Sequence, residues 1–319
     1  MPLLEIENLT VSFPQHEGVV QAVRGVSFSV EKGESIGIVG ESGSGKSVTC
    51  MAVLRLLREP PARIAADKIE LGGVNMLRAS GVQLAAVRGR VAAMVFQDPM
   101  TAFDPVFTIG HQIVETIRAH RSLSRAQATS EAAALLARVE IRAPELILNS
   151  YPHQLSGGML QRAMIAMALS CRPQILFADE PTTALDVTMQ AQILSLIKDL
   201  QAEFGMGLIM VTHDLGVVAE TVDRVMVMYG GRVMETAPVQ DIFDTPAHPY
   251  TQALLHSMPG RTPGKQRLIE IPGASPNPSN PPSGCPFQPR CHQADARCVA
   301  EAPPVVTLSK TRAAACWRL

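Results

Sequence analysis

A glycine- and serine-rich segment near the start of the chain has the residues of a phosphate-binding loop. Residues Gly40–Ser47 read GESGSGKS and fit the pattern GxxxxGK followed by Ser or Thr. Glycines let the backbone pass close to phosphate groups, and the free N–H groups at a helix start favour an anion. The Lys46 ammonium can reach β- and γ-phosphates, and the Ser47 hydroxyl can bind Mg²⁺. Against the alternative of a turn without a ligand, the pattern predicts a nucleotide site formed by Gly40, Ser42, Gly43, Ser44, Gly45, Lys46 and Ser47.

Two acidic residues follow an apolar run at Ile175–Glu180, which reads ILFADE. A strand with this ending would place Asp179 at the carboxyl edge of a sheet, near the phosphate loop, where it can hold the shell of a Mg²⁺ ion. Glu180 can then polarise the attacking water as a general base. Such a run is commonly a strand followed by a solvated turn, but its combination with the phosphate loop favours the catalytic interpretation.

The hydrophobic pattern indicates the elements that position these motifs. Apolar and polar residues alternate at the N-terminus, which is typical of antiparallel strands. Short apolar runs at Ser35–Gly40, Ile175–Ala178 and Leu208–Val211 predict buried strands. Helices are predicted at about Lys46–Arg58 and Val187–Phe204. This alternation of strands and helices indicates an α/β fold with a mostly parallel sheet covered on both faces.

Two regions differ from this pattern. Residues from about 100 to 170 have helical periodicity with few β-branched residues, which predicts a helical subdomain. After about residue 245, prolines and glycines become dense. Such a segment forms little helix or sheet and needs another means of ordering. We therefore expect a phosphate-binding domain over residues 1–245 and a C-terminal extension over residues 246–319.

The composition limits the class of protein. Of the 319 residues, 46% are hydrophobic and 18% are charged, which predicts a globular protein with a substantial core. The net charge of -1 gives no electrostatic support for nucleic-acid binding. No apolar run approaches the roughly 20 residues of a membrane-spanning helix, and the N-terminal MPLLEIENLTVSF lacks the features of a signal peptide. We expect a cytosolic protein that reaches a membrane only through a partner.

The segment Leu155–Gln161 reads LSGGMLQ and resembles the LSGGQ-like signature motif of ATP-binding cassette ATPases. Met159 replaces the usual glutamine, while the serine and both glycines are intact. In this family the signature of one subunit faces the phosphate loop of the other, so the resemblance implies a dimer. The Ser156 hydroxyl and the Gly158 N–H would then contact the γ-phosphate, whereas Ser-Gly-Gly alone is also typical of a helix N-cap. The implied nucleotide-binding set is Ser156, Gly157, Gly158 and Gln161.

Further landmarks of this family occur in order along the chain. Gln97, in VFQDP, resembles the Q-loop glutamine that senses Mg²⁺ or the attacking water. Asp186, in the tripeptide ALD, matches the D-loop in the nucleotide-binding set, and His213, in VTHD, matches the switch histidine that contacts the γ-phosphate. Phe13 lies where the family has an aromatic residue that stacks on adenine, although it would equally suit a strand core. The resemblance thus implies Glu180, His213 and Gln97 as catalytic residues and Ser47, Gln97 and Asp179 as the Mg²⁺ set.

The C-terminal segment narrows the resemblance. His248–Leu254 reads HPYTQAL and is similar to the ATPase subunits of the dipeptide, oligopeptide and nickel importer family. Some members of that family carry a 4Fe–4S cluster on four late cysteines, and four thiolates suit iron–sulfur or tetrahedral zinc chemistry. The lack of a C-x2-C pair favours iron–sulfur, with zinc and unligated thiols as alternatives, and a metal would order the proline-rich segment. The four cysteines are Cys285, Cys291, Cys298 and Cys316.

The resemblance implies a motor that hydrolyses ATP for peptide import at the cytoplasmic face of the membrane. Its implied partners are a second homologous ABC ATPase in a heterodimer, two transmembrane permeases and an extracytoplasmic solute-binding protein, without nucleic acid. Nickel and glutathione-like solutes stay open as alternatives, since the motor does not touch the solute. A soluble cassette ATPase is less favoured, because such proteins usually carry two cassettes or long coiled-coil insertions. The implied fold is an α/β P-loop NTPase with an N-terminal antiparallel β-subdomain, a helical subdomain and a cysteine- and proline-rich extension.

Overall fold

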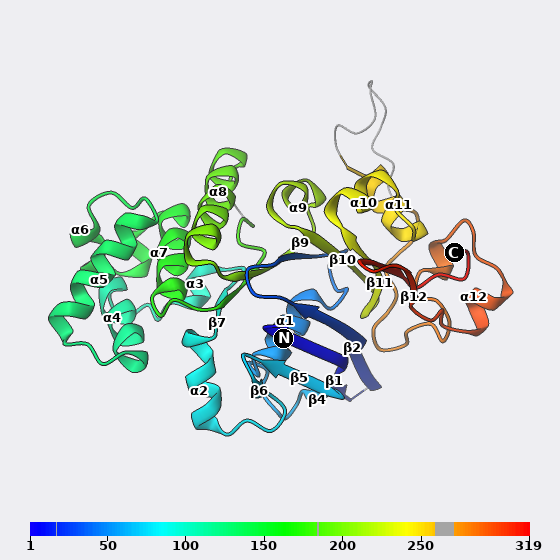
Figure 1. Cartoon of the computed structure of the whole chain (residues 1–319), viewed down its shortest axis with the longest axis horizontal. Helices are drawn as coiled ribbons and strands as arrows, with labels where there is room; N and C mark the ends of the chain where they lie inside the picture. Colours follow the sequence, from blue (N-terminus) through cyan, green and yellow to red (C-terminus); the bar gives the residue numbers. More distant parts are fainter. Residues whose placement is uncertain (17, 184, 259–270) are drawn as a thin grey trace.

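The computed structural model describes residues 1–16, 18–183, 185–258 and 271–319. It contains an N-terminal antiparallel sheet, a larger mixed sheet and a lobe of helices (Figure 1). The helical lobe lies at one end of the molecule and the C-terminal segment at the other, with the two sheets between them. The predictions of an α/β core and of an N-terminal antiparallel sheet are confirmed.

The N-terminal sheet forms from the alternating segment at the start of the chain. Within the described residues its strand order is β2-β1-β5-β6, β4 also pairs with β1, and the pairings are antiparallel. The buried residues of β1 have even numbers before Asn8 and odd numbers after it. The pairing with β2 shifts register there, and Asn8, with a φ of 52°, is the extra residue of this bulge. The strands are β1 (Leu4–Gln15), β2 (Gly18–Val30), β4 (Arg63–Ala65), β5 (Lys68–Leu71) and β6 (Val74–Asn75).

The larger sheet has the strand order β12-β13-β11-β10-β3-β9-β8-β7 within the described part of the chain. Strands β10, β3, β9, β8 and β7 run parallel, so their carboxyl ends meet at one edge. Strands β11, β13 and β12 extend the sheet through antiparallel pairings. The strands are β3 (Ser35–Val39), β7 (Ala92–Val95), β8 (Ile175–Asp179), β9 (Gly207–Thr212), β10 (Arg224–Tyr229), β11 (Arg232–Pro238), β12 (Val306–Ser309) and β13 (Arg312–Ala314).

Both faces of the parallel strands are buried, as their continuous apolar runs predicted. On β8, Ile175 and Phe177 belong to a core shared with the N-terminal sheet. Leu176 and Ala178 belong to a second core, shared with the helical lobe. Successive residues of a strand point to opposite faces, so one strand contributes to both cores. This double burial makes β8 a rigid support for the acidic residues at its carboxyl end.

None of the helices in the described ranges is long and apolar enough to cross a membrane. Helix α1 ends at Val53, before the predicted end near Arg58. The prediction was wrong there because Arg55 has a left-handed φ of 55° and Pro60 and Pro61 cannot continue a helix. Helices α4–α7 form the lobe in Figure 1. The helices are α1 (Lys46–Val53), α2 (Gly81–Arg90), α3 (Pro99–Ala102), α4 (Ile109–His120), α5 (Arg125–Arg138), α6 (Pro144–Leu148), α7 (Gly157–Leu169), α8 (Val187–Phe204), α9 (Leu215–Thr221), α10 (Val239–Asp244), α11 (Pro249–His256) and α12 (Ala296–Ala300), with 3-10 turns at Pro152–Gln154 and Gln288–Arg290.

The C-terminal segment is ordered largely by the sheets. Strand β13 pairs with β11, and the Ala315 N–H donates to the Met234 carbonyl at 2.8 Å. The Gln21 N–H on β2 donates to the Pro278 carbonyl at 2.9 Å, so the segment also contacts the N-terminal sheet. These contacts hold the proline-rich segment in place, although it forms little helix or sheet of its own. The sequence did not predict the edge strands, because they are only three and four residues long.

Candidate active site

The predicted phosphate loop connects the end of β3 to the start of α1, as its motif requires. Gly40 has a φ of 152°, and a Cβ atom there would lie 2.1 Å from the Met228 carbonyl oxygen. Gly45 has a φ of 100°, and a Cβ atom there would lie 2.4 Å from the Ala22 carbonyl oxygen. No side chain among the described residues caps the first turn of α1, so its N–H groups are free to bind phosphate oxygens.

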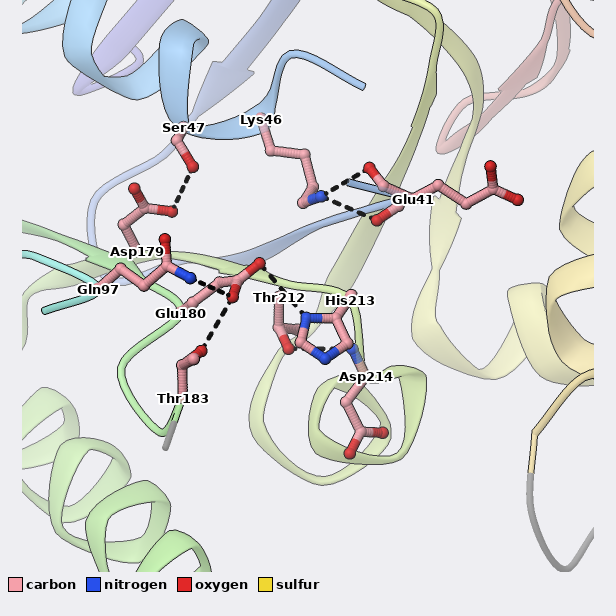
Figure 2. Close-up of polar contacts among 11 residues, drawn as sticks. Glu41, Lys46, Ser47, Gln97, Asp179, Glu180, Thr183, Thr212, His213 and Asp214 are labelled. Atoms are coloured by element: carbon pink, nitrogen blue, oxygen red, sulfur yellow. Dashed lines mark hydrogen bonds and ion pairs between the residues drawn. The ribbon is translucent and has the colours of Figure 1, made fainter. Parts of the chain in front are cut away.

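Polar atoms of the loop are arranged for a phosphate group. Ser42 and Gly43 form the exposed tip, while the Ser44 hydroxyl is buried and has no hydrogen-bond partner in the described part of the chain. Lys46 is 5% exposed, and its ammonium donates to the carbonyl oxygens of the first two loop residues at 2.8 and 3.0 Å (Figure 2). Burial lowers the pKa of Lys46, and nearby carboxylates oppose this shift. The Ser44 hydroxyl and the Lys46 ammonium are thus donors that a triphosphate can use.

Ser47 and Asp179 form the pair that the sequence predicted for Mg²⁺. The Ser47 hydroxyl, on α1, donates to Asp179 Oδ1, on β8, at 2.7 Å (Figure 2). Burial raises the pKa of Asp179, and the hydrogen bond from Ser47 opposes this shift. Hydroxyl and carboxylate oxygens are hard donors that suit Mg²⁺. The donor set therefore fits a Mg²⁺ ion that accompanies nucleotide phosphates.

The side chains of Gln97, Thr183 and His213 surround the Glu180 carboxylate (Figure 2). Gln97 Nε2 donates to Glu180 Oε2 at 3.0 Å, and Thr183 Oγ1 donates to the same oxygen at 2.9 Å. His213 Nδ1 lies 3.3 Å from Glu180 Oε1. The Glu180 backbone has a φ of 45°, and its N–H donates to the Val211 carbonyl at 2.9 Å, which ties this residue to β9. The carboxylate is thereby held in one direction at the sheet edge, as a general base requires.

Neighbouring parallel strands bring this cluster together. Gln97 follows β7, Glu180 follows β8 and His213 follows β9, and these three strands are adjacent in the sheet. In open α/β sheets, side chains that follow the carboxyl ends of neighbouring strands converge on one crevice. The catalytic residues implied by the sequence therefore lie together, on the same edge as Asp179.

Sequence patterning did not single out Thr183, which contacts Glu180 directly. Its signal was weak, because it is one of two threonines in a turn three residues after the acid. The segment that carries His213 is also held by neighbours. The Asp214 N–H donates to Thr212 Oγ1 at 3.0 Å, and the Asp214 carboxylate caps α9. Local turn residues thus stabilise both loops that flank the Glu180 carboxylate.

The signature segment begins α7, which lies apart from α1 in Figure 1. Ser156 is the N-cap of this helix, with its hydroxyl accepting from the Met159 N–H at 3.4 Å, and Gly157 and Gly158 form the first turn. The N-cap interpretation is therefore correct for the isolated chain. Contact of these residues with a γ-phosphate would require the phosphate loop of another subunit.

The other implied nucleotide-binding residues lie in different surroundings. Gln161 is 3% exposed, and its amide donates to the Pro181 carbonyl at 2.7 Å. Asp186 caps α8 by accepting an N–H of the first turn at 3.0 Å, while Ala184 of the same motif lies outside the described residues. Phe13 is half-buried on β1 and packs against the core of the N-terminal sheet. Their roles toward a nucleotide stay predictions.

Comparison with known proteins identifies the family that shares this geometry. A family model described as ABC transporter matches residues 23–183. The chain belongs to the ABC transporter family. A second model, described as the C-terminal region of oligopeptide/dipeptide transporters, matches residues 234–298 of this ABC transporter protein. The predicted resemblance to importer ATPases is confirmed by both matches.

Two curated relatives of this ABC transporter protein match nearly its whole length, and a third matches about four fifths of it. The probable peptide ABC transporter ATP-binding protein y4tR of Sinorhizobium fredii is 51% identical over 317 residues, which are 99% of this chain and 95% of that protein. The dipeptide transport ATP-binding protein DppD of Escherichia coli K12 is 46% identical over 316 residues, which are 99% of this chain and 96% of that protein. The glutathione import ATP-binding protein GsiA of Escherichia coli O1:K1 is 54% identical over 262 residues, which are 81% of this chain and 42% of that protein.

A solved cassette, MJ0796, has the same fold. Its dimeric post-hydrolysis structure, bound to ADP and phosphate, is 28% identical to this chain with a TM-score of 0.66. The match covers 74% of this chain and 98% of the cassette. The ABC ATPase fold is thereby confirmed, and the chain is an ATPase that couples hydrolysis to transport.

The four late cysteines line one cavity but do not form a metal site. The cavity has a volume of about 10 Å³, close to the minimum for a single water molecule. Burial raises the pKa of Cys285 to about 11, so this thiol is neutral near pH 7. Among the described residues, no group of three or more His, Cys, Asp or Glu side chains is arranged to hold a metal ion. The 4Fe–4S prediction is therefore wrong, and the zinc alternative has no support, because spacing does not set the directions in which thiols point. The cysteines concerned are Cys285, Cys291, Cys298 and Cys316.

Proposed function

We propose that this chain is the ATP-hydrolysing subunit of an importer for dipeptides and longer peptides. The observation that carries the proposal is the match of residues 234–298 to the C-terminal region of oligopeptide/dipeptide transporters. Full-length similarity to a dipeptide transport ATP-binding protein supports it. A cassette alone serves many kinds of transport, whereas this extension is described for peptide transporters. The glutathione import relative supports glutathione-like solutes as the second candidate.

Two ATPase subunits close over ATP in this proposal. The solved cassette with the same fold is dimeric, which supports the pairing. The Ser156 hydroxyl and the Gly158 N–H of one subunit contact the γ-phosphate held by the phosphate loop of the other. The second subunit is a homologous ABC ATPase, so the complex contains a heterodimer. Phe13 stacks on the adenine, and Gly157, Gln161 and Asp186 complete the nucleotide-binding set.

Glu180 is the general base of the hydrolysis. Its carboxylate takes a proton from the water that attacks the γ-phosphorus, while the bond from the γ-phosphorus to the bridging oxygen breaks and ADP leaves. Gln97, Thr183 and His213 hold the carboxylate in the direction of that water. Closure of the dimer excludes other water from the reacting atoms.

Positive charge and hydrogen-bond donors compensate the charge of the triphosphate. Lys46 moves its ammonium from the loop carbonyls to the β- and γ-phosphate oxygens. The buried Ser44 hydroxyl donates to a phosphate oxygen. Ser47, Asp179 and Gln97 would hold Mg²⁺, which neutralises charge on the phosphate oxygens when it is bound.

The complex lies at the cytoplasmic face of the inner membrane as a peripheral ATPase bound to two permeases. The segment after Gln97 and the helical lobe over about residues 100–170 transmit closure to the permeases. An extracytoplasmic solute-binding protein delivers the peptide, and no nucleic acid takes part. Residues 1–245 form the ABC ATPase domain and residues 246–319 the extension. The names of the full-length relatives, all of them transport ATP-binding proteins, support this assembly.

A reconstituted transporter tests the proposal. The chain, its homologous ATPase and both permeases are placed in liposomes, and ATP hydrolysis is measured with the solute-binding protein and a dipeptide, glutathione or Ni²⁺. Peptide import predicts the strongest stimulation with the dipeptide. Stimulation by glutathione alone would favour the second candidate, and stimulation by Ni²⁺ alone would contradict peptide import. The Glu180→Gln complex controls for contaminating ATPases.

A further inference from the structure

The side chain of Glu41 connects the phosphate loop to the C-terminal extension. Glu41 is the second residue of the loop, and its carbonyl oxygen accepts a hydrogen bond from Lys46 at 3.0 Å. Its carboxylate extends away from Lys46 (Figure 2) and bonds to residues 234 and 249 positions later in the chain. One residue therefore contacts the phosphate-binding lysine through its main chain and the extension through its side chain.

Arg290 holds the Glu41 carboxylate from the extension. Its Nη1 donates to Glu41 Oε2 at 2.7 Å and also to the Tyr229 hydroxyl at 3.0 Å. Its other nitrogens donate to the carbonyl oxygens of Pro272 at 2.9 Å and Ile271 at 3.0 Å. The Arg290 side chain is only 6% exposed, and that of Glu41 is 24% exposed. Such a shielded pair, with a hydrogen bond from every guanidinium nitrogen, fixes orientation, because breaking it leaves a buried charge without a partner.

Tyr250 holds the main chain of the same residue. The Glu41 N–H donates to the Tyr250 hydroxyl oxygen at 3.0 Å, and Tyr250 is fully buried on α11. The Tyr250 ring packs against Tyr229 at 4.5 Å and Phe287 at 5.2 Å between ring centroids. This packing leaves the hydroxyl little freedom to follow a moving loop, so the N–H of Glu41 has a fixed acceptor.

Ser275 supplies a third contact from the extension, since its hydroxyl also donates to Glu41 Oε2. The contacts thus come from separate parts of the extension, before and after the prolines of residues 276–282. Tyr250, Ser275 and Arg290 lie outside the residues matched by the ABC transporter model. The phosphate loop in this chain is therefore braced by a segment that the cassette match does not include.

We propose that Arg290 and Tyr250 are positioning residues for ATP binding, and that the extension acts on the phosphate loop through Glu41. They fix the side chain and the N–H of Glu41 and so keep the loop backbone in the conformation that receives a triphosphate. Neither residue belongs to the catalytic set around Glu180. The inference rests on the nucleotide site described above but not on the identity of the imported solute.

The test measures KM for ATP and kcat in the assembled transporter. Arg290→Met removes the charge with little change in length, and Tyr250→Phe removes only the hydroxyl. We expect each to raise KM roughly tenfold while kcat changes less than about threefold, because the contacts position the loop and do not touch the reacting atoms. Arg290→Lys keeps the charge and recovers part of the affinity, although it lacks the planar fork. The double variant Glu41→Gln/Arg290→Met should be no worse than the more severe single variant.

Lys310→Met is the matched control. It removes a positive charge from an exposed turn of the same extension, and the Lys310 side chain has no hydrogen bond or ion pair with the described residues. KM should therefore not change. A wild-type KM in folded Arg290→Met and Tyr250→Phe complexes overturns the proposal, as does an equal effect of Lys310→Met. If Arg290→Met does not assemble, Tyr250→Phe decides alone.

This result is separable from failure of the proposed function. A wild-type complex without peptide stimulation contradicts peptide import, but it leaves KM for ATP measurable. Lys46→Ala should abolish ATP binding. This variant gives the lower limit of ATP affinity against which the positioning variants are compared. A purely structural role of Arg290 would lower the thermal midpoint without raising KM, and this outcome also overturns the proposal.

Discussion

Gln97 Nε2 lies 3.0 Å from Glu180 Oε2, although 83 residues separate the two along the chain. Thr183 donates to the same oxygen, so two donors orient the carboxylate. The other oxygen, Oε1, lies beside His213, whose side chain is 64% exposed. Neither Gln97 nor Thr183 donates to Glu180 Oε1, so we expect this oxygen to take a proton from a water molecule.

Removal of the Thr183 hydroxyl should disturb this orientation. We expect Thr183→Val to lower kcat roughly tenfold with little change in KM for ATP, since one hydrogen bond to the carboxylate is lost. Thr183→Ser keeps the hydroxyl and should retain most of the activity. Steady-state ATP hydrolysis by the assembled complex checks both variants. Equal activity of Thr183→Val and the wild type would show that Gln97 and His213 are sufficient to orient the carboxylate.

Two substitutions of Ser156 distinguish its capping role on α7 from a contact with the nucleotide bound by another subunit. Ser156→Asn keeps an oxygen that caps α7 but loses the hydroxyl, whereas Ser156→Ala loses both. We expect both variants to bind ATP in the phosphate loop and both to hydrolyse it at least about tenfold more slowly. Only Ser156→Ala should also lose about 1 kcal/mol of stability. Normal hydrolysis by Ser156→Asn would restrict Ser156 to the cap.

Burial of His248 predicts a pH dependence of stability. Its pKa falls from 6.5 to about 4, because burial disfavours the charged imidazole. The unfolded chain binds a proton on His248 near pH 6.5, whereas the folded chain binds it only near pH 4. The contribution of His248 to the free energy of unfolding is therefore fully present above pH 6.5 and is lost as the pH falls toward 4. We expect a loss of about 2 kcal/mol between about pH 7 and 5 from this residue.

His248→Asn tests that dependence. In the wild type, the Tyr250 N–H donates to His248 Nδ1 at 3.0 Å. Asparagine keeps a side-chain acceptor for this N–H but does not titrate. Urea unfolding of both proteins at about pH 7 and 5 isolates the contribution, since other titrating groups are common to both. An equal loss of unfolding free energy in the variant would contradict the assignment.

Local patterns predicted the parts of the site that depend on neighbouring residues in the sequence. The loop around Lys46 was identified because a strand, glycines and a helix follow one another within a short segment. Asp179 and Glu180 were identified because a buried strand ends in two acids. The placement of Gln97 and His213 followed from the family resemblance, and the structure adds the reason, which is that β7, β8 and β9 are adjacent.

The remaining features depend on contacts that no local pattern records. Glu41 and Arg290 are 249 residues apart. Glu41 occupies a variable position of the phosphate-loop pattern, and Arg290 belongs to no motif that the sequence offered. Thr183 is an ordinary turn residue until the fold places Gln97 opposite Glu180. The cysteine spacing suggested a metal site, but among the described residues no group of three or more His, Cys, Asp or Glu side chains is arranged to hold a metal ion.

The central claim, that Glu180 is the general base of this ATPase, is tested most directly by Glu180→Gln in single-turnover hydrolysis. Glutamine keeps the shape of the side chain but accepts no proton. We expect the variant complex to bind ATP and to hydrolyse it at least about a hundredfold more slowly. Glu220→Gln, at an exposed position on α9, is the matched control and should behave as the wild type. Near-normal turnover by Glu180→Gln would contradict the account.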